Sequence, residues 1–312
     1  MSSKPSPDAS RTRASLPRVG FVGAGRVANA LAMGLSAAGY PVSAIASRSS
    51  KSVRKLVGRL NASGNTQAIE TDPQAVLGHA DLVFLTVPDD ALVATAHSLQ
   101  ASPEQSIVHC SGASDVDVLE GLSTQGALTG GFHPLYLFAG LEDDAQRLAG
   151  CSITIEAAQP LASTLREAAK ALRCKAISIP AGQRTLYHAG ANLAASSLLC
   201  VLDEAVGIWQ QIGIAEADAL EALWPLVMGT LASARQKGLP GALSGPVSRG
   251  DDRIVARHLE ALDSLGSDHA AFYAALTQRA VALARRRGNA DPETDQALTR
   301  IDDMANQYSR KS

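Results

Sequence analysis

A side chain suited to proton transfer and one suited to orienting a ligand lie four residues apart near the middle of the chain. His188 and Asn192 fall in the segment YHAGAN, residues 187–192, and share one face if that segment is helical. Histidine exchanges a proton near neutral pH, and an amide can orient a polar group of a ligand. We therefore interpret His188 as a candidate proton donor, Asn192 as an orienting residue and Tyr187 as a substrate contact. A buried histidine that bonds across a helix interface is the alternative.

A third catalytic candidate, His133, lies in an aromatic-rich segment. Residues 132–138 read FHPLYLF, and the His-Pro pair predicts a turn. Such a turn would place His133 at the mouth of a sheet, in a substrate pocket. The alternative is a His-Pro turn with a purely structural role.

A loop rich in glycine and proline, residues 243–251, holds two more polar candidates. Ser248 and Arg249 are interpreted as substrate contacts, because a guanidinium binds a carboxylate or phosphate through two parallel hydrogen bonds. Asp251, at the end of this loop, is predicted to cap a helix over residues 252–265.

The segment GAGRVA, residues 23–28, has the G-x-G-x-x-G/A spacing of a phosphate-binding turn. It follows a strand candidate at 18–22 and opens a helix whose apolar residues share one face. The first glycine allows the tight bend, the second lets a pyrophosphate approach the backbone, and the small Ala28 allows close packing. We expect Gly23, Gly25, Arg26 and Val27 to bind a dinucleotide at the N-terminus of this helix.

The residues after the second strand candidate, 42–46, indicate which dinucleotide binds. A site for NAD favours an acidic side chain there, which accepts a hydrogen bond from the ribose 2′-hydroxyl. This chain has Ser47, Arg48 and Ser49 instead. A guanidinium and two hydroxyls suit a 2′-phosphate, which an acidic residue would repel. The expected cofactor is therefore NADP(H), and a solvated basic helix start is the alternative.

Two further turns follow strand candidates at 82–87 and 107–110. Because parallel sheets bind ligands at the carboxyl ends of their strands, we expect Val87, Pro88 and Ser111 to line the cofactor site. Asp89 has two interpretations, a ligand contact or the N-cap of the next helix.

The elements that must position these residues fall into two regions. Over residues 18–180 strand and helix patterns alternate, which predicts an α/β fold with a doubly wound, mostly parallel Rossmann sheet. Over residues 181–312 the strand signals disappear, and a long helix at about 183–211 is followed by more helices. This all-helical domain is expected to hold much of the substrate pocket. Residues 1–17, rich in Ser, Pro and Arg, are expected to be a disordered tail.

The composition excludes several classes of function. The chain has 28 Lys and Arg, 30 Asp and Glu, and 4% aromatic residues. Nucleic-acid binding needs a basic face or clustered aromatics, so no nucleic-acid partner is expected. No apolar run reaches the roughly 18 residues needed to span a membrane, so no membrane partner is expected. Four widely spaced cysteines, with no CxxC pair, predict no metal site and suit a reducing cytoplasm.

Taken together, these segments resemble a known family: a Rossmann-like NADP-binding domain followed by a helical domain of unknown function 2520. The resemblance covers residues 18 to about 290 and rests on GFVGAGRVANAL at 20–31, VPD at 87–89, HCSGA at 109–113, FHPL at 132–135, YHAGAN at 187–192 and SGPVSRGD at 244–251. It implies NADP(H) and a homodimer formed through the C-terminal helical domain.

The family is similar to pyrroline-5-carboxylate reductases, ketopantoate reductases and β-hydroxyacid dehydrogenases. In the β-hydroxyacid dehydrogenases a Lys and an Asn one helical turn apart act on the substrate. Here His188 takes the place of that Lys, and Asn192 matches the Asn. Because an imidazolium differs from an ammonium in both shape and acid strength, the β-hydroxyacid reaction does not carry over directly.

The expected function is that of an NADPH-dependent oxidoreductase that reduces a small keto or imino acid in a cleft between the domains. His188 would donate the proton, Asn192 would orient the substrate, and His133 and Arg249 would contact it. A cyclic-imine reductase that acts on a pyrroline carboxylate-like compound is one alternative. A non-catalytic NADP(H)-binding sensor or scaffold is the other.

Overall fold

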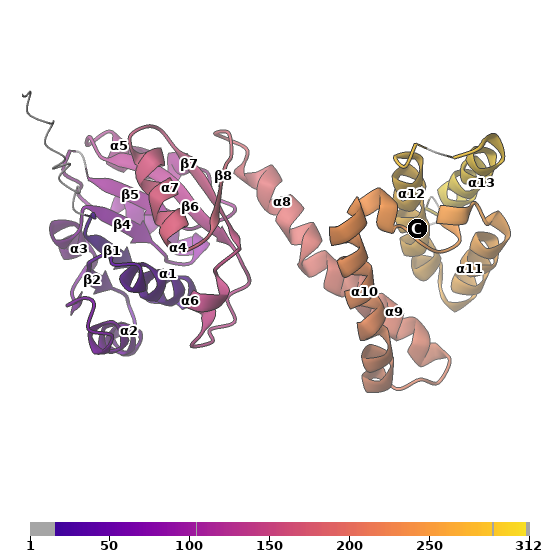
Figure 1. Cartoon of the computed structure of the whole chain (residues 1–312), viewed down its shortest axis with the longest axis horizontal. Helices are drawn as coiled ribbons and strands as arrows, with labels where there is room; N and C mark the ends of the chain where they lie inside the picture. The colour runs from indigo at the N-terminus through magenta and orange to yellow at the C-terminus, as the bar shows by residue number, and fades with distance from the viewer. Residues whose placement is uncertain (1–15, 104, 289, 310–312) are drawn as a thin grey trace, which may run out of the picture. The chain divides into compact units, whose positions relative to one another are not determined.

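The computed structural model describes residues 16–103, 105–288 and 290–309. Its contacts divide the chain into two compact units, residues 1–195 and 196–312, coloured indigo to rose and rose to yellow in Figure 1. The expected tail, residues 1–17, lies outside the described residues except for Leu16 and Pro17. The helix after residue 183, expected to open the second domain, is grouped by its contacts with the first unit.

An eight-stranded sheet forms the centre of the first unit, with the strand order β3-β2-β1-β4-β5-β6-β7-β8. Neighbouring strands are parallel except for β6 and β7, which are antiparallel. This arrangement confirms the predicted α/β fold with a mostly parallel Rossmann sheet. The strands are β1 (Val19–Val22), β2 (Val42–Ala46), β3 (Ile69–Glu70), β4 (Leu82–Leu85), β5 (Ser106–His109), β6 (Leu128–Leu135), β7 (Ser152–Ala157) and β8 (Lys175–Ser178).

Helices cover both faces of this sheet (Figure 1), because successive strand residues point to opposite sides. Phe21 and Phe84 pack with α1, α2 and α7, whereas Val22 and Leu85 pack with α3 and α4. The helices of the first unit are α1 (Arg26–Ala37), α2 (Ser50–Ala62), α3 (Pro73–His79), α4 (Asp89–His97), η1 (Val116–Leu119), α5 (Glu120–Ser123), α6 (Asp144–Arg147), α7 (Leu161–Ala171) and α8 (Arg184–Ala194).

The described part of the second unit is helical, as expected. It comprises α9 (Ser196–Gln211), α10 (Glu216–Ala242), η2 (Val247–Arg249), α11 (Asp252–Leu265), α12 (Ser267–Arg285) and α13 (Pro292–Ser309). Buried apolar residues of α11, α12 and α13 form its main core, and a smaller cluster joins α9 to α10. Asp251 caps α11 as predicted, since its carboxylate accepts a hydrogen bond from the Ile254 backbone N–H at 3.2 Å.

The sequence predicted one long helix at about 183–211, but the structure has two helices there, α8 and α9. Ala195 leaves helical geometry, with φ −112° and ψ −81°, and separates α8 from α9. Two serines follow, Ser196 and Ser197, a residue type whose side chains compete for backbone hydrogen bonds and so weaken a helix.

This stretch also bears on the expectation that no segment is apolar enough to span a membrane. Among the described residues, Arg184–Gln211 is one helical stretch that is long and apolar enough by length and composition, with a mean hydropathy of 1.4 and 6% of the tested window buried. The expectation that no apolar segment is long enough is therefore wrong by length and composition. One such stretch is nevertheless weak evidence of a membrane span.

Candidate functional site

A cavity of about 1220 Å³ runs along the carboxyl ends of strands β2, β1 and β4 in the first unit. Its wall includes the glycine turn at 23–27, the serine-rich turn at 47–49 and the turn at 86–88, with Cys110 and His133 at one side. Open α/β sheets bind dinucleotides at such an edge, where the strand order changes direction between β1 and β4.

Local geometry explains the two glycines of the turn. Gly23 has φ +115°, and a Cβ there would lie 2.6 Å from the Thr86 carbonyl carbon, so a side chain is excluded. Thr86 fixes the turn by donating its hydroxyl to the Gly23 carbonyl at 3.2 Å. Gly25 has no atom within 4 Å of its Cβ direction, which leaves open space for a ligand. The turn thus has the form that a pyrophosphate requires.

The N-terminus of α1 faces this cavity with no acidic residue in its first turn and no side-chain cap on Gly25. Its free N–H groups and partial positive charge suit a phosphate group. Arg26 lines the cavity too, and its guanidinium donates to the Phe138 carbonyl at 3.0 Å. Arg26 therefore also holds the loop after β6 against the phosphate-binding turn.

The serine-rich turn forms a second polar pocket at the end of β2. Ser47, Arg48 and Ser49 line the cavity together with Ser52, which sequence reasoning did not include. Ser49 caps α2 by accepting a hydrogen bond from the Ser52 backbone N–H at 3.3 Å, and the first turn of α2 has no acidic residue. Hydroxyls, a guanidinium and a helix N-terminus at one place fit the 2′-phosphate of NADP(H).

Several lining residues escaped the sequence analysis. Small side chains on one face of α4 form a wall of the cavity, at positions 91, 94, 95 and 98. Their spacing of three and four residues is the signal that could have revealed them. The cavity is also lined by Tyr136, Leu137 and Phe138, which belong to the aromatic-rich segment already noted in the sequence. The rings of Tyr136 and Phe138 meet edge to face with their centroids 5.0 Å apart.

His133 lies on strand β6, so the predicted turn at this position is wrong. The strand continues through Pro134 because residues 130–135 pair with β7 in an antiparallel register that the local sequence does not reveal. His133 nevertheless lines the cavity, as expected. Burial, followed by the nearby charge of Arg184, lowers the pKa of His133 to about 4, so its ring is neutral near pH 7.

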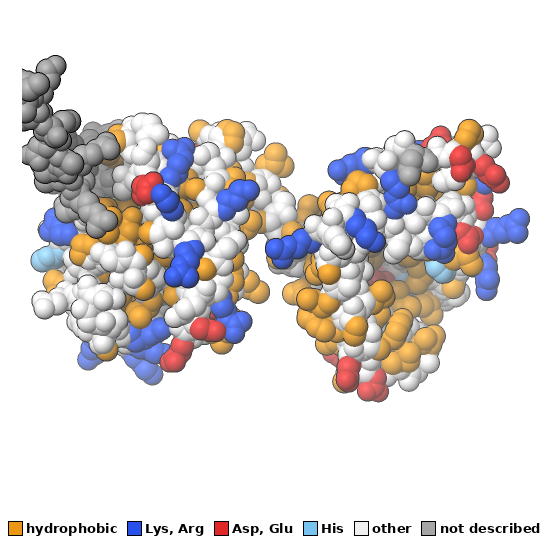
Figure 2. Space-filling view, in the orientation of Figure 1, with side chains coloured by type: hydrophobic (Ala, Val, Ile, Leu, Met, Phe, Trp, Pro, Cys, Tyr) orange, Lys and Arg blue, Asp and Glu red, His pale blue; other side chains and the backbone are white. Residues whose placement is uncertain are grey.

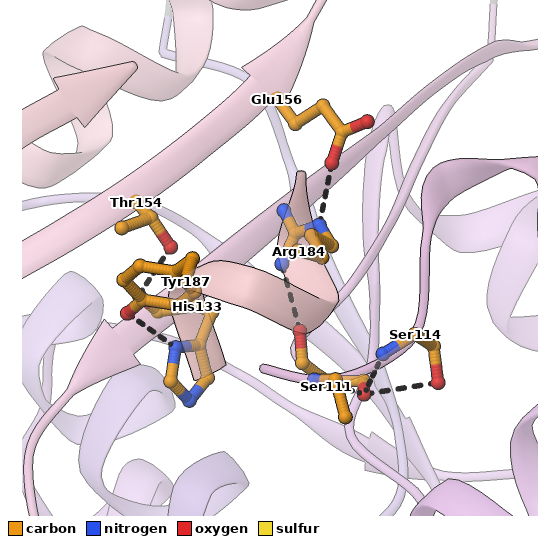
Figure 3. A network of polar contacts seen from close by, with 8 residues as sticks. Ser111, Ser114, His133, Thr154, Glu156, Arg184 and Tyr187 are labelled. Carbon is orange, nitrogen blue, oxygen red and sulfur yellow. Dashed lines mark hydrogen bonds and ion pairs between the residues drawn. The ribbon is translucent and has the colours of Figure 1, made fainter. Parts of the chain in front are cut away.

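Tyr187 reaches His133 from helix α8 (Figure 3). Its hydroxyl lies 3.0 Å from His133 Nδ1, and the two rings meet edge to face. Burial raises the pKa of Tyr187, so both groups are neutral near pH 7. When Tyr187 donates its O–H to Nδ1, the proton of the neutral imidazole must be on Nε2. Thr154 on β7 donates to the His133 carbonyl at 3.3 Å and holds the strand beneath it.

Gly112, in the loop after β5, brings the two predicted catalytic histidines together. A Cβ at Gly112 would lie 2.9 Å from His133 Nε2 and 2.9 Å from His188 Cδ2. Both imidazoles therefore pack over the same piece of bare backbone. His188 is exposed and His133 half-buried, so the pair combines a solvent-accessible ring with a neutral, enclosed one.

The remaining predicted residues have varied positions. Asn192 is exposed on α8, one turn after His188. Ser111 is buried outside the cavity wall, where its hydroxyl accepts hydrogen bonds from the backbone N–H groups of Ala113 and Ser114. Ser248 and Arg249 lie in the second unit, in η2, and their substrate contacts stay predictions.

Asp89 is the first residue of α4 and lies after the cap position, which Pro88 occupies, so the N-cap interpretation is wrong. The segment 86–88, including Val87 and Pro88, lines the cavity as expected. Among the described residues, no group of three or more His, Cys, Asp or Glu side chains is placed to hold a metal ion.

Comparison with protein-family models gives two matches. Residues 3–134 match a Rossmann-like domain, and residues 151–280 match domain of unknown function DUF2520. No curated protein sequence matches the chain.

Solved structures share the fold at low sequence identity. A protein from Thermotoga maritima is 20% identical, with a TM-score of 0.69 over 87% of this chain and 100% of its own. A 1-pyrroline-5-carboxylate reductase from Streptococcus pyogenes is 17% identical, with a TM-score of 0.56 over 92% and 100%. A reductive aminase from Aspergillus terreus in complex with NADPH is 13% identical, with a TM-score of 0.57 over 95% and 94%.

The fold and the cavity define a protein of the Rossmann class, with a fold that the pyrroline-5-carboxylate reductase and the reductive aminase share. Within that class, the chain combines a Rossmann-like domain with a DUF2520 domain, which confirms the resemblance found in the sequence.

Proposed function

We propose that this protein is an NADPH-dependent reductase that acts on a small keto or imino acid. The proposal rests on one observation: the imidazole rings of His133 and His188 both pack against the backbone of Gly112, and His133 also lines the dinucleotide cavity. A proton donor beside a hydride-transfer site is what reduction of a C=O or C=N bond requires. When bound, NADPH supplies the hydride to the carbon of that bond.

The residues of this chain supply the proton and the orientation. His188 donates a proton to the substrate oxygen or nitrogen as it gains the electron pair, then regains a proton from solvent, to which it is exposed. Neutral His133 and Tyr187 act as hydrogen-bonding contacts to the substrate. Asn192 orients the polar group of the substrate, and Ser248 and Arg249 contact its acid group.

Preference for NADP(H) over NAD(H) is part of the proposal. It is supported by the absence of acidic residues in the first turn of α2 and by Arg48 among cavity-lining serines. The A. terreus reductive aminase, which has this fold, was solved with NADPH bound.

We also propose a cytoplasmic homodimer formed through the helical domain. Large apolar side chains gather on the surface of α9 and α10 (Figure 2), where Leu199 and Leu226 are each 66% exposed and Trp224 is 51% exposed. Surfaces of this kind mark interfaces. Light scattering should give twice the chain mass for the wild type and the chain mass for a variant with Leu199→Glu and Leu226→Glu. A monomeric wild type would contradict the dimer.

The test of the function is a turnover screen with NADPH against cyclic imines, acyclic imines and 2-keto acids. We expect one of these classes to be reduced, with the product identified by mass spectrometry. Turnover of cyclic imines alone would identify the pyrroline carboxylate-like alternative. Tight NADPH binding without turnover of any class would favour a non-catalytic sensor or scaffold.

A further inference from the structure

Arg184, the first residue of α8, is a fully buried cation at the base of the candidate site (Figure 3). Its side chain is 0% exposed. Nε donates to Glu156 Oε2 on β7 at 2.6 Å, and Nη1 donates to the Ser111 carbonyl after β5 at 2.8 Å. One guanidinium thus connects three segments that are far apart in the sequence.

The strand between those segments is shaped to admit the guanidinium. A Cβ on Gly131 of β6 would overlap the Arg184 guanidinium. Only glycine leaves this space, so the bare backbone of β6 and the fork of Arg184 fit one another. A charge placed so specifically has a positional role as well as a packing role.

The segments that Arg184 connects carry the candidate catalytic groups. Tyr187 and His188 follow it by three and four residues, so all three side chains share one face of α8. The Ser111 carbonyl that it binds precedes Gly112, over which both histidine rings pack. A shift of the guanidinium would therefore move both rings relative to that loop.

The energetics favour a positioning role over simple stabilisation. A buried ion pair contributes little net stability, because the loss of hydration offsets the attraction between the charges. Arg184 also leaves Nη2 without a hydrogen-bond partner among the described residues. An apolar pair would fill the same volume without that penalty, so a guanidinium fork at this position points to a geometric task.

We propose that Arg184 is the positioning residue of this site, and that its paired fork fixes Tyr187 and His188 against Gly112 and His133. The inference rests on the proposed reductase function and adds a residue that the sequence did not single out. Glu156 and the Ser111 carbonyl are its partners in this role.

The charge of Arg184 also reaches His133. After burial, Arg184 and then His188 lower the pKa of His133, whereas Asp89 at the start of α4 raises it. Tyr187 faces the same ring on the α8 side, and His109 lies near it on β5. Loss of the guanidinium should therefore raise the pKa of His133, which gives a readout independent of turnover.

Two variants test the proposal. Arg184→Lys keeps the charge but cannot make both fork contacts, so kcat should fall about 10- to 100-fold while the Kd for NADPH changes less than about twofold. Arg184→Met combined with Glu156→Leu removes the pair without leaving a buried charge, and should raise the pKa of His133 measured by NMR. Arg18→Lys, in the exposed pair with Asp81, is the matched control and should change none of these values.

The outcomes separate the two proposals. If Arg184→Lys keeps wild-type kcat, or the double variant leaves the pKa of His133 unchanged, Arg184 has no positioning role. If neither the wild type nor any variant turns over a substrate, the proposed reductase function is wrong. The measured pKa of His133 then tests the positioning role of Arg184 by itself. If Arg184→Lys does not fold, the double variant supplies both kcat and the pKa of His133.

Discussion

Arg48 and the serines around it decide how the cavity distinguishes the two nicotinamide dinucleotides. Its side chain is exposed at the cavity wall between Ser47 and Ser49, so it can fold onto a ligand at little cost. A guanidinium binds a phosphate through two charge-assisted hydrogen bonds, and it has no such contact with a 2′-hydroxyl.

Arg48→Asp should therefore invert the preference. Loss of a charge-assisted contact and gain of repulsion should weaken NADPH binding about 10- to 100-fold and leave NADH binding equal or stronger. Fluorescence titration with both dinucleotides measures this. Equal affinities of the wild type for NADH and NADPH, unchanged in the variant, would show that the 2′-phosphate is not recognised here.

Single residues also show where sequence reasoning stopped. The glycine turn at 23–28 was predictable because its spacing is local and each position has one physical task. Arg184 was not predictable, because its partners Glu156 and Ser111 are 28 and 73 residues away. Only the folded sheet brings those groups together.

At the scale of elements, the loop after β5 is the surface against which the rings of His133 and His188 pack. Ser111 holds this loop through the backbone of Ala113 and Ser114, so Gly112 has little freedom to move away. Strands β1, β2, β4 and β5 of the first unit followed from local patterning. Strand β6 did not, because its antiparallel pairing with β7 overrides the turn signal of Pro134.

The Gly112→Ala variant tests whether this packing against Gly112 matters for turnover. The new methyl group would lie 2.9 Å from both imidazole rings, so at least one ring must shift. We expect kcat to fall at least about tenfold, with NADPH affinity near the wild-type value. Gly58→Ala in α2 is the control, because a Cβ there meets no atom within 4 Å. A wild-type kcat in a folded Gly112→Ala protein would contradict the packing of both imidazole rings against Gly112.

At the scale of the whole molecule, one buried histidine, His109, and one half-buried histidine, His133, make the first unit sensitive to acid. Burial is the main cause that lowers the pKa of His109 to about 3 and that of His133 to about 4, from the ordinary 6.5. Below pH 6.5 the unfolded chain takes up protons that the folded chain does not. The free energy of unfolding of this unit therefore has its full value above pH 6.5 and decreases as the pH falls toward 4.

The predicted loss is at most about 3 kcal/mol for each histidine over this interval. Amide hydrogen exchange in β5 and β6 measures it, since both tryptophans, Trp209 and Trp224, lie in the second unit and report on that unit. His133→Asn should reduce the slope of stability against pH. A protection factor in β6 that does not change between pH 7 and pH 4 would contradict the neutral, enclosed state of His133.

The most direct test of the account is a single-turnover measurement of bound NADPH, followed by its nicotinamide absorbance, in the wild type and in His188→Ala. After mixing with an imine or keto acid that the screen identifies, the wild type should oxidise its NADPH. The variant should bind NADPH with the same Kd and oxidise it at least about 100-fold more slowly, because it lacks the proton donor. Equal oxidation rates in the two proteins would contradict the assignment of His188, and no oxidation in the wild type would contradict the proposed reductase.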